Sequence, residues 1–490
     1  MLKFNHVKIL GILSIILGVL FVIFFYEQKI GISYTIYTIV LVAYHYFALR
    51  TKKEFRSKVY FGGIIYIILL STIYLRSDFI LFRALNFIAV PVLLCVNLML
   101  CLDVDIKLIA GNTLGIIFVP ISKMHKLFIE LFSNRRKESN NKNSQIFVKV
   151  LLGIAISIPA LFIIINLLTS ADVVFADKLS HILSGLEDVV KADIVIKILL
   201  AIIVSAYFFG QIYYLYDNKN RKSVVRQEEK ESNTSFKGFD RIITITFMAI
   251  LDIVYIAFTM IQFVYLFGGN NNLPVGYTYA EYAREGFFQL VFLSVINIVL
   301  IFIINKLYLG IKIKDDISNK DYNYRKDIIV DSLLSIMVIC TFVLIISSIY
   351  RLGLYEEAYG YTRLRLLVYM FIVFETLIMI LVAINIWNKK LPIIRIGIIV
   401  SLASYLIINF INIDGIVARE NINRYVETGK IDFHYLVDLS TDAAGEMSRL
   451  KNIDDKMYGE YIEYLNTYEL EEVQWQSFNL SQYNAKKLVE

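Results

Sequence analysis

About eleven apolar segments, each long enough to cross a lipid bilayer, follow one another along this 490-residue chain. A hydrocarbon core of roughly 30 Å needs about 20 apolar helical residues to span it. Within lipid, every backbone N–H and C=O group must be satisfied inside the protein, which leaves helices or a closed barrel. The hydrophobicity is continuous rather than alternating, so it predicts helices. The expected spans are Ile9–Tyr26, Ile30–Leu49, Tyr60–Leu75, Ile80–Cys101, Ile146–Leu168, Ile194–Leu215, Ile242–Phe267, Phe287–Ile304, Ile329–Tyr350, Leu364–Trp387 and Ile393–Ile411.

The composition agrees with a protein whose solvent is lipid. Hydrophobic residues make up 57% of the chain and charged residues 19%, whereas soluble domains carry about 25% charged residues. The three cysteines, Cys95, Cys101 and Cys340, fall in or at the ends of apolar segments, so we interpret them as small buried hydrophobic residues. We therefore predict an all-α fold, a polytopic transmembrane helical bundle, with the lipid bilayer as its partner.

The positions of lysine and arginine predict the orientation of the bundle, because positive charge resists translocation. Basic residues gather in the connections at 50–58, 107–149, 219–241, 306–326 and 389–395. These loops are expected in the cytoplasm, which puts the N-terminus inside and the residues after the last span outside. The net charge of +6 then reflects membrane topology, and we predict no nucleic-acid partner.

The chain divides into two expected parts. Residues 1–412 form the transmembrane helical domain, including a cytoplasmic interfacial segment at 103–145, where basic residues interrupt an apolar pattern and suit phospholipid head groups. Residues 413–490, called the tail below, carry fifteen acidic residues against eight basic ones from Asp414 onward. The tail is expected to form short amphipathic helices on the outer face.

Polar side chains inside the spans are the first candidates for chemistry. Asp252, Tyr255, Thr259 and Gln262 are three, four and three residues apart, so a helix places them on one face. Glu375 lies near the middle of another span. Two carboxyl groups at mid-membrane depth suit a proton or cation relay. Alternatively, both are protonated or hydrogen-bonded to neighbouring helices and only help the bundle to pack.

Two outer connections, at 277–290 and 351–366, concentrate charge and tyrosine. Tyrosine suits the head-group region of any membrane, but the opposed carboxylates and guanidinium groups are denser than anchoring requires. We therefore expect a docking site within the protein, or a site for an anionic lipid or small-molecule ligand, with the side chains in one cluster. The candidate residues are Glu281, Arg284, Glu356, Arg363, Arg365, Arg419, Asn421 and Arg424.

Catalytic motifs are absent from the sequence. The five histidines are scattered, and there is no His-Glu-x-x-His or Cys-x-x-Cys pattern, no phosphate-binding loop and no Gly-x-Ser-x-Gly turn. We predict no metal site, no cofactor and no catalytic residue. A lipid-linked transferase would need an outer carboxylate as base or metal ligand, for which Asp172, Asp177, Glu281 and Glu356 are the candidates.

Several blocks of sequence resemble a known family. They are YLFGG at Tyr265–Gly269, TYAEYAREGFFQL at Thr278–Leu290, LYEEAYGYTRLRL at Leu354–Leu366 and the run at Ile413–Ala444, with RALN at Arg83–Asn86 and TSAD at Thr169–Asp172. The chain resembles a family of bacterial polytopic membrane proteins known only as a domain of unknown function. The resemblance implies a many-helix protein of the bacterial cell membrane. It brings no activity, cofactor or site residue.

The sequence thus favours a non-enzymatic envelope protein that senses, scaffolds or binds a ligand through its outer face. One alternative is a secondary transporter that uses Asp252 and Glu375. The other is an extracytoplasmic lipid-linked transferase. The sequence does not decide the ligand or the oligomeric state.

Overall fold

The computed structural model describes residues 4–52, 55–102, 115, 117–132, 192–216, 241–267, 287–315, 327–469 and 474–490. In these ranges every regular element is helical. Ten helices among them are long and apolar enough to cross a membrane, and each coincides with a predicted span. The remaining predicted span, Ile146–Leu168, and most of the segment 103–145 lie outside the described residues. The fold is an all-α polytopic bundle, and the chain is a multi-pass membrane protein of the lipid bilayer.

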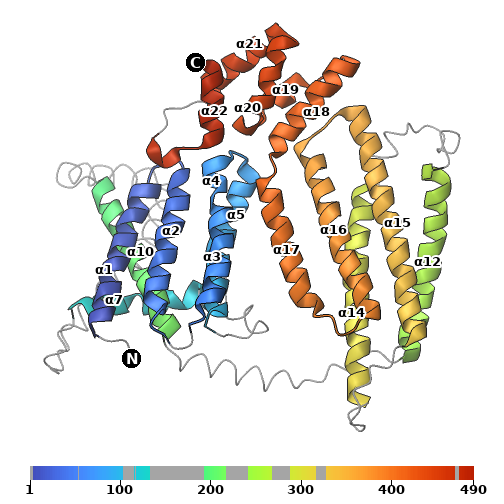
Figure 1. The fold of residues 1–490 in the computed structure, drawn as a ribbon, viewed down its shortest axis with the longest axis horizontal. Helices are drawn as coiled ribbons and strands as arrows, with labels where there is room; N and C mark the ends of the chain where they lie inside the picture. The colour runs from blue at the N-terminus through green and yellow to red at the C-terminus, as the bar shows by residue number, and fades with distance from the viewer. Residues whose placement is uncertain are drawn as a thin grey trace, which may run out of the picture. The chain divides into compact units, whose positions relative to one another are not determined.

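Internal contacts divide the chain into two units (Figure 1). The N-terminal unit comprises Met1–Ser232 and Glu471–Tyr483. The C-terminal unit comprises Asn233–Leu470 and Asn484–Glu490. Most of the tail therefore belongs to the C-terminal unit, and a short stretch near its end belongs to the N-terminal unit.

The N-terminal unit is a bundle of apolar helices in which α1 packs against α10 and α2 (Figure 1). Gly18 permits the close approach of α1 and α10, because a Cβ atom there would lie 2.1 Å from the Ala201 carbonyl oxygen. His45 is buried and its Nε2 lies 2.9 Å from the Gln211 side-chain oxygen, which joins α2 to α10. The helices are α1 (Phe4–Phe25), α2 (Ile32–Leu49), α3 (Ser57–Ser71), α4 (Ile73–Arg76), α5 (Ile80–Leu100), α7 (His125–Phe132) and α10 (Ala192–Tyr216).

The stretch of the tail in the N-terminal unit is held by backbone and side-chain hydrogen bonds. The Asn479 amide donates to the carbonyl oxygens of Tyr74 and Ser77, each at 2.9 Å. The Ile32 N–H donates to the Phe478 carbonyl oxygen at 3.0 Å. Buried backbone groups need such partners. This stretch, which includes the start of α22 (Leu480–Val489), thereby completes the ends of α2 and α4.

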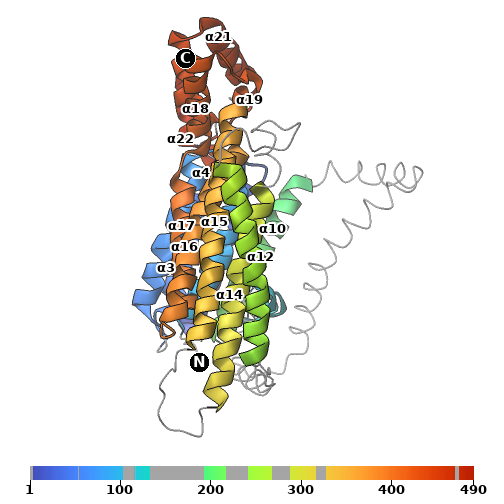
Figure 2. The ribbon, with the colours of Figure 1, turned by 90° about the vertical axis from the view of Figure 1, so that its right-hand side faces the viewer.

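Among the described residues, the C-terminal unit contains five long helices, of which α15 is the central one. Helix α15 packs against α12, α14 and α16, and α17 packs against α16. Figure 2 shows α12, α14, α15 and α16 running side by side. A core of buried aliphatic and methionine side chains, including Met248, Leu334 and Met379, fills one end of the unit. The helices are α12 (Arg241–Phe267), α14 (Phe287–Asp315), α15 (Ile328–Tyr359), α16 (Arg363–Trp387) and α17 (Ile393–Phe410).

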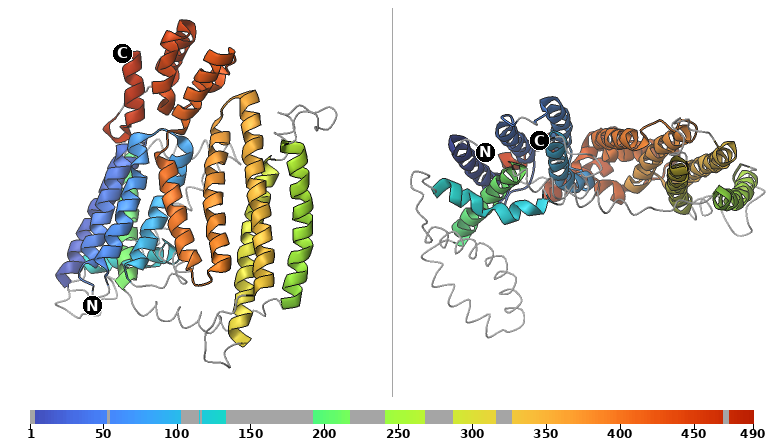
Figure 3. Two further views of the ribbon diagram at one scale, coloured as in Figure 1. Left: turned by 45° about the vertical axis from the view of Figure 1, so that its right-hand side comes forward. Right: turned by 90° about the horizontal axis from the view of Figure 1, so that it is seen from below.

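The tail residues of this unit fold as short helices at one end of the bundle (Figure 3). Helix α18 begins where the Asn412 side chain accepts the Gly415 N–H, and it ends at Gly429 in the left-handed conformation, as helix termini often do. It packs against α16 and α20. The division between residues 1–412 and 413–490 stays a prediction. The helices are α18 (Ile413–Thr428), α19 (Phe433–Val437), α20 (Ala444–Met447) and α21 (Asp455–Tyr464).

Helices α14 and α15 extend beyond the predicted spans, and α14 continues past Ile304 to Asp315. Helix α15 was expected to leave the membrane at Tyr350, yet it continues to Tyr359. Its extension carries Arg351 and Glu356, which are 5% and 7% exposed. Arg351 donates to the Gln262 side chain at 3.0 Å, so its charge has a partner within the bundle. Since charged side chains satisfied in this way can be buried, the helix extends beyond the apolar run.

Candidate functional site

A carboxylate of the tail is buried against an arginine at the start of α16. Asp414, in the first turn of α18, is 0% exposed. It accepts two hydrogen bonds from Arg363, from Nε at 2.6 Å and from Nη2 at 2.7 Å. The Ser440 N–H donates to it at 2.8 Å, and the Ser440 hydroxyl donates as well. This bidentate, charge-assisted arrangement satisfies both carboxylate oxygens.

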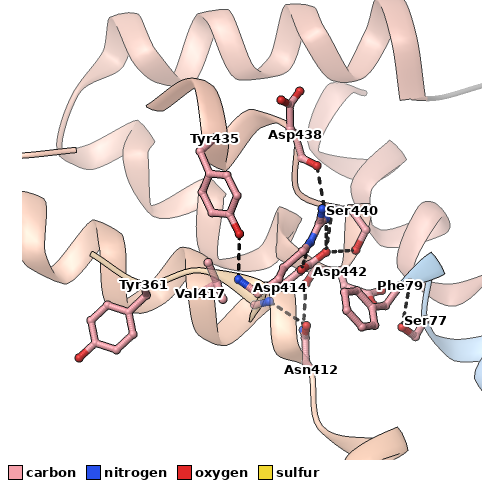
Figure 4. A network of polar contacts seen from close by, with 12 residues as sticks. Ser77, Phe79, Tyr361, Asn412, Asp414, Val417, Tyr435, Asp438, Ser440 and Asp442 are labelled. Atoms are coloured by element: carbon pink, nitrogen blue, oxygen red, sulfur yellow. Dashed lines mark hydrogen bonds and ion pairs between the residues drawn. The ribbon is translucent and has the colours of Figure 1, made fainter. Parts of the chain in front are cut away.

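The same arginine holds further parts of the tail. Its backbone N–H donates to the Tyr435 hydroxyl at 2.8 Å, and its Nη2 donates to the Asp438 carbonyl oxygen at 3.3 Å. Figure 4 shows Tyr435, Asp438 and Ser440 gathered around Asp414. Burial, the largest cause, raises the pKa of Tyr435, so its hydroxyl stays neutral at physiological pH. Arg363 thus fixes α18, α19 and the turn that follows them.

A second contact joins the tail to the turn between α15 and α16. The Asn421 side chain accepts the Tyr361 N–H at 3.0 Å and donates to the Tyr361 carbonyl oxygen at 2.8 Å. Gly360 allows this approach, because it has a φ of +80° and a Cβ atom would lie 2.6 Å from the Asn421 side-chain oxygen. Arg424 adds a hydrogen bond to the Ala358 carbonyl oxygen at 2.9 Å.

The other outer-face candidates divide between this contact and the surface. The Arg365 guanidinium lies 4.0 Å from the centre of the Tyr355 ring and donates to the Gly360 carbonyl oxygen. Glu356 hydrogen-bonds with Tyr369. Arg419 instead pairs at 3.0 Å with its neighbour Glu420, and its side chain is 47% exposed. The structure brings Glu356, Arg363, Arg365, Asn421 and Arg424 to the α15–α16 turn. Glu281 and Arg284 lie outside the described residues.

The intramembrane candidates on α12 face α14 and α15. The Tyr255 hydroxyl donates to the Asn297 side chain of α14. The Thr259 hydroxyl lies beside the Cys340 thiol of α15. The Gln262 side-chain oxygen accepts hydrogen bonds from Ser347 at 2.9 Å and from Arg351 at 3.0 Å. These three members of the predicted stripe are therefore turned toward other helices of the bundle.

Asp252 is the member of the stripe that carries a carboxyl group. It is 3% exposed, and neither carboxyl oxygen has a hydrogen-bond partner in the structure. It lies one helical turn from the fully buried Met248 and close to Cys340. Buried polar groups in proteins are nearly always hydrogen-bonded, so an acid in this position calls for an explanation.

Glu375 on α16 is also buried, at 2% exposed. One carboxyl oxygen accepts the Ser294 hydroxyl of α14, and the other has no partner. Ser294 lies three residues from Asn297, whose amide donates to the Thr341 hydroxyl at 3.1 Å. Helix α14 therefore carries neighbouring polar groups, one contacting Glu375 and the other contacting Tyr255 of the α12 stripe.

A further polar cluster, near the ends of α14 and α16, was missed by the sequence analysis. Lys389 donates to Asp331 at 2.9 Å and to the Asn305 side-chain oxygen at 2.6 Å. The Asn305 amide donates to the Asn385 side chain at 3.0 Å. The members of this cluster come from α14, α15 and the end of α16, which are distant along the chain, so spacing within one segment did not reveal it.

The described residues contain no group of three or more histidine, cysteine, aspartate or glutamate side chains that could hold a metal ion. Asp252 and Glu375 lie in membrane-spanning helices and each has a carboxyl oxygen without a hydrogen-bond partner.

Comparison with known proteins identifies a family and no characterised relative. A family model described as a domain of unknown function, DUF4153, matches residues 64–450. No curated protein and no solved structure matches the chain. The matched region contains all the intramembrane candidates and the whole contact between the α15–α16 turn and α18. The chain belongs to the DUF4153 family, whose function is unknown.

Proposed function

We propose that the protein is a secondary transporter of the bacterial cell membrane that moves a solute in exchange for protons carried by Asp252 and Glu375. One observation carries this proposal: Asp252 is 3% exposed in the middle of a membrane-spanning helix and has no hydrogen-bond partner for either oxygen. The cell-membrane location rests on the basic loops and on the bacterial blocks in the sequence.

The energetics of burial support a protonation cycle. An aspartate at the centre of a membrane helix costs about 2.5–3.5 kcal/mol on insertion scales, and a charge without a partner costs more when it is also shielded from water. The conformation described here suits the neutral acid. To release its proton, Asp252 must gain water or a cationic partner, which requires the surrounding helices to move. Such a requirement couples proton release to a conformational change.

The layout of α12, α14, α15 and α16 also supports transport. Polar groups meet at mid-helix around Asn297 and Ser294. One buried apolar cluster contains Leu334 and Met337, and a second contains Leu352 and Phe287. On α15 these clusters lie on either side of Thr341. Secondary transporters place their substrate sites near the bilayer midplane. The polar groups here lie between two apolar clusters along α15, which agrees with such an arrangement.

A non-enzymatic scaffold or sensor is the second candidate. The tail contributes to both units, since Glu471–Tyr483 belongs to the N-terminal one and the preceding tail residues belong to the C-terminal one. Of the outer-face charges that suggested a ligand site, Arg363 binds Asp414 of the tail, and Arg424 of the tail binds the Ala358 carbonyl oxygen. For a transferase, the described candidate Glu356 is 7% exposed, and no other observation favours that activity.

Proton flux into proteoliposomes tests the main proposal. Purified protein is reconstituted around a pH-sensitive dye, an acid-outside gradient is imposed, and the potential is clamped with potassium and valinomycin. The assay is run with and without a small-molecule extract of cells. We expect flux above that of empty liposomes, reduced tenfold or more in Asp252→Asn and Glu375→Gln. The matched control is Glu357→Gln, because Glu357 is exposed next to Glu356.

Two results would contradict transport by these acids. One is the absence of flux above empty liposomes in both conditions. The other is wild-type flux in Asp252→Asn. Circular dichroism and size-exclusion chromatography of each variant separate a loss of flux from a loss of folding.

A further inference from the structure

An apolar groove with a cavity volume of about 550 Å³ lies in the C-terminal unit between α14, α16 and α17. Its walls are mainly aliphatic and aromatic side chains, among them Val295, Ile298, Phe371, Phe374 and Ile398. The volume falls within the range of about 300–1,000 Å³ that is usual for small-molecule sites. The groove is therefore large enough to take a small amphiphile or part of one.

Two lining residues have polar side chains, and one of them is already satisfied. The Ser401 hydroxyl donates to the Gly397 carbonyl oxygen at 2.8 Å, within α17. Glu375 is the other. It is 2% exposed, Ser294 occupies one of its oxygens, and the second oxygen has no partner. The groove thus combines an apolar wall with one carboxyl group whose second oxygen is buried and unpaired.

Gly397 gives the groove part of its width. A Cβ atom at this position would meet nothing within 4 Å. Its backbone is helical, where glycine is less favourable than leucine. A larger side chain here would enter the groove without a clash against the backbone. The position therefore offers a way to fill the groove while α17 keeps its structure.

We infer that this groove binds an amphiphilic amine, with its hydrocarbon in the groove and its protonated nitrogen on Glu375. The apolar walls favour a hydrocarbon body. An ammonium group supplies the charge-assisted hydrogen bond that the free carboxylate oxygen lacks. It also neutralises a charge that is otherwise costly to bury. A plain acyl chain leaves that oxygen unsatisfied, and an anionic head group would be repelled.

The inference rests on the proposed function where transport is concerned, because it names the class of solute that exchanges with the Glu375 proton. The exchange is balanced: the acid releases one proton, and the ammonium ion of the amine takes its place as the positive charge. No covalent bond changes. Binding itself requires neither a gradient nor Asp252, so it can be tested separately from transport.

Photolabelling of the protein in lipid nanodiscs tests the groove. The probe is dodecylamine carrying a diazirine on its chain, and mass spectrometry locates the labelled peptides. We expect saturable labelling of α16 and α17 that unlabelled dodecylamine displaces and dodecanol or dodecyl sulfate displaces far less. Loss of a hydrogen bond to a charged group predicts an affinity roughly tenfold to hundredfold lower in Glu375→Gln.

Gly397→Leu should abolish the labelling. The matched control is Gly62→Leu on α3, where a Cβ atom also meets nothing within 4 Å but the groove is not involved. Equal labelling in wild type and Glu375→Gln would overturn the inference, since the groove would then take hydrocarbon without regard to the acid. The binding test is independent of the transport test. If dodecylamine binds but no proton flux is measured, the result supports binding in the groove and contradicts the transporter.

Discussion

Arg363 and Asp414 form a bidentate ion pair, with Nε–Oδ1 and Nη2–Oδ2 distances of 2.6 and 2.7 Å, that joins the first residue of α16 to the second residue of α18. The carboxylate is 0% exposed, and its remaining hydrogen bonds come from Ser440. Asp414 therefore organises the tail around the start of a membrane-spanning helix.

The first prediction is that Asp414→Asn loosens the tail from the C-terminal unit. Removing one partner of a buried ion pair typically costs about 3–5 kcal/mol, and we expect about 2–3 kcal/mol here because the Arg363 side chain is 32% exposed. Limited proteolysis should cut the tail faster in this variant. Glu420→Gln is the control, since its pair with Arg419 is at the surface and should contribute less than about 1 kcal/mol. Equal cleavage rates in the two variants would be incompatible with this role for Asp414.

The second prediction concerns Gly360 and Asn421. In Gly360→Ala, the left-handed backbone and a Cβ atom 2.6 Å from the Asn421 oxygen should together destabilise the turn by about 2 kcal/mol or more. Asn421→Ala removes the clash together with the two hydrogen bonds to Tyr361 and the one to the Val417 carbonyl oxygen. The double variant should therefore be more stable than the sum of the single losses predicts. Thermal unfolding of all four proteins measures the coupling, and strictly additive losses would show that no clash exists.

Much of the fold could be predicted from the sequence because lipid imposes a simple rule. A long apolar run must become a spanning helix, and the ten described spans follow the predicted ones. The end of α15 could not be predicted from the sequence. Arg351 and Glu356 look like loop residues until their partners on α12 and α16 are known, and those partners are distant in sequence.

The candidate site could be predicted only in part, because the partners of its residues lie on other helices. Helical spacing predicted that Tyr255 and Gln262 share a face of α12, and their partners in the structure lie on α14 and α15. Spacing along one helix does not reveal which neighbour it faces. The roles of Ser294 beside Glu375 and of Asp414 beside Arg363 depend on tertiary contacts. The sequence therefore does not predict the partner of a polar residue whose own segment shows no periodic pattern.

The third prediction is a pH dependence of the tail at Asp454. The pKa of this carboxyl is below its ordinary value, chiefly because it accepts the Met457 N–H at the start of α21, and also because the Tyr425 hydroxyl donates to it. Its stabilising effect should therefore be complete above the ordinary carboxyl pKa of about 3.9 and lost as the pH falls through the lower folded value.

Asp454→Asn isolates this effect, because asparagine also caps helices well but does not titrate. Hydrogen exchange of α21, measured from pH 6 to pH 3, should show a wild-type advantage that shrinks as the pH falls below about 3.9. Subtracting the variant removes the contribution of the other carboxyl groups. Parallel profiles for the two proteins would contradict a role for the Asp454 charge.

The fourth prediction is the orientation of the chain. The described cysteines, Cys95, Cys101 and Cys340, are buried, and a variant without them provides a background for new ones. A cysteine replacing the exposed Lys456 of α21 should react with an impermeant thiol reagent on intact cells. One replacing the exposed Lys390, between α16 and α17, should react only after lysis, because basic connections stay inside. The opposite pattern would reverse the predicted topology.

The fifth prediction concerns the buried pair of Lys389 and Asp331, whose side chains are 10% and 3% exposed. Lys389→Met should destabilise the C-terminal unit by about 3–5 kcal/mol, because it leaves a buried carboxylate without its cation. Adding Asp331→Leu should recover most of that loss, since an apolar pair of similar volume is often as stable as a buried ion pair. Thermal unfolding in detergent measures both changes.

If the double variant is no more stable than Lys389→Met, the hydrogen bond from Lys389 to Asn305, rather than neutralisation of Asp331, accounts for the stability. If the end of the bundle at Lys389 opens during transport, the double variant should also change the rate of proton flux, because opening must separate this pair.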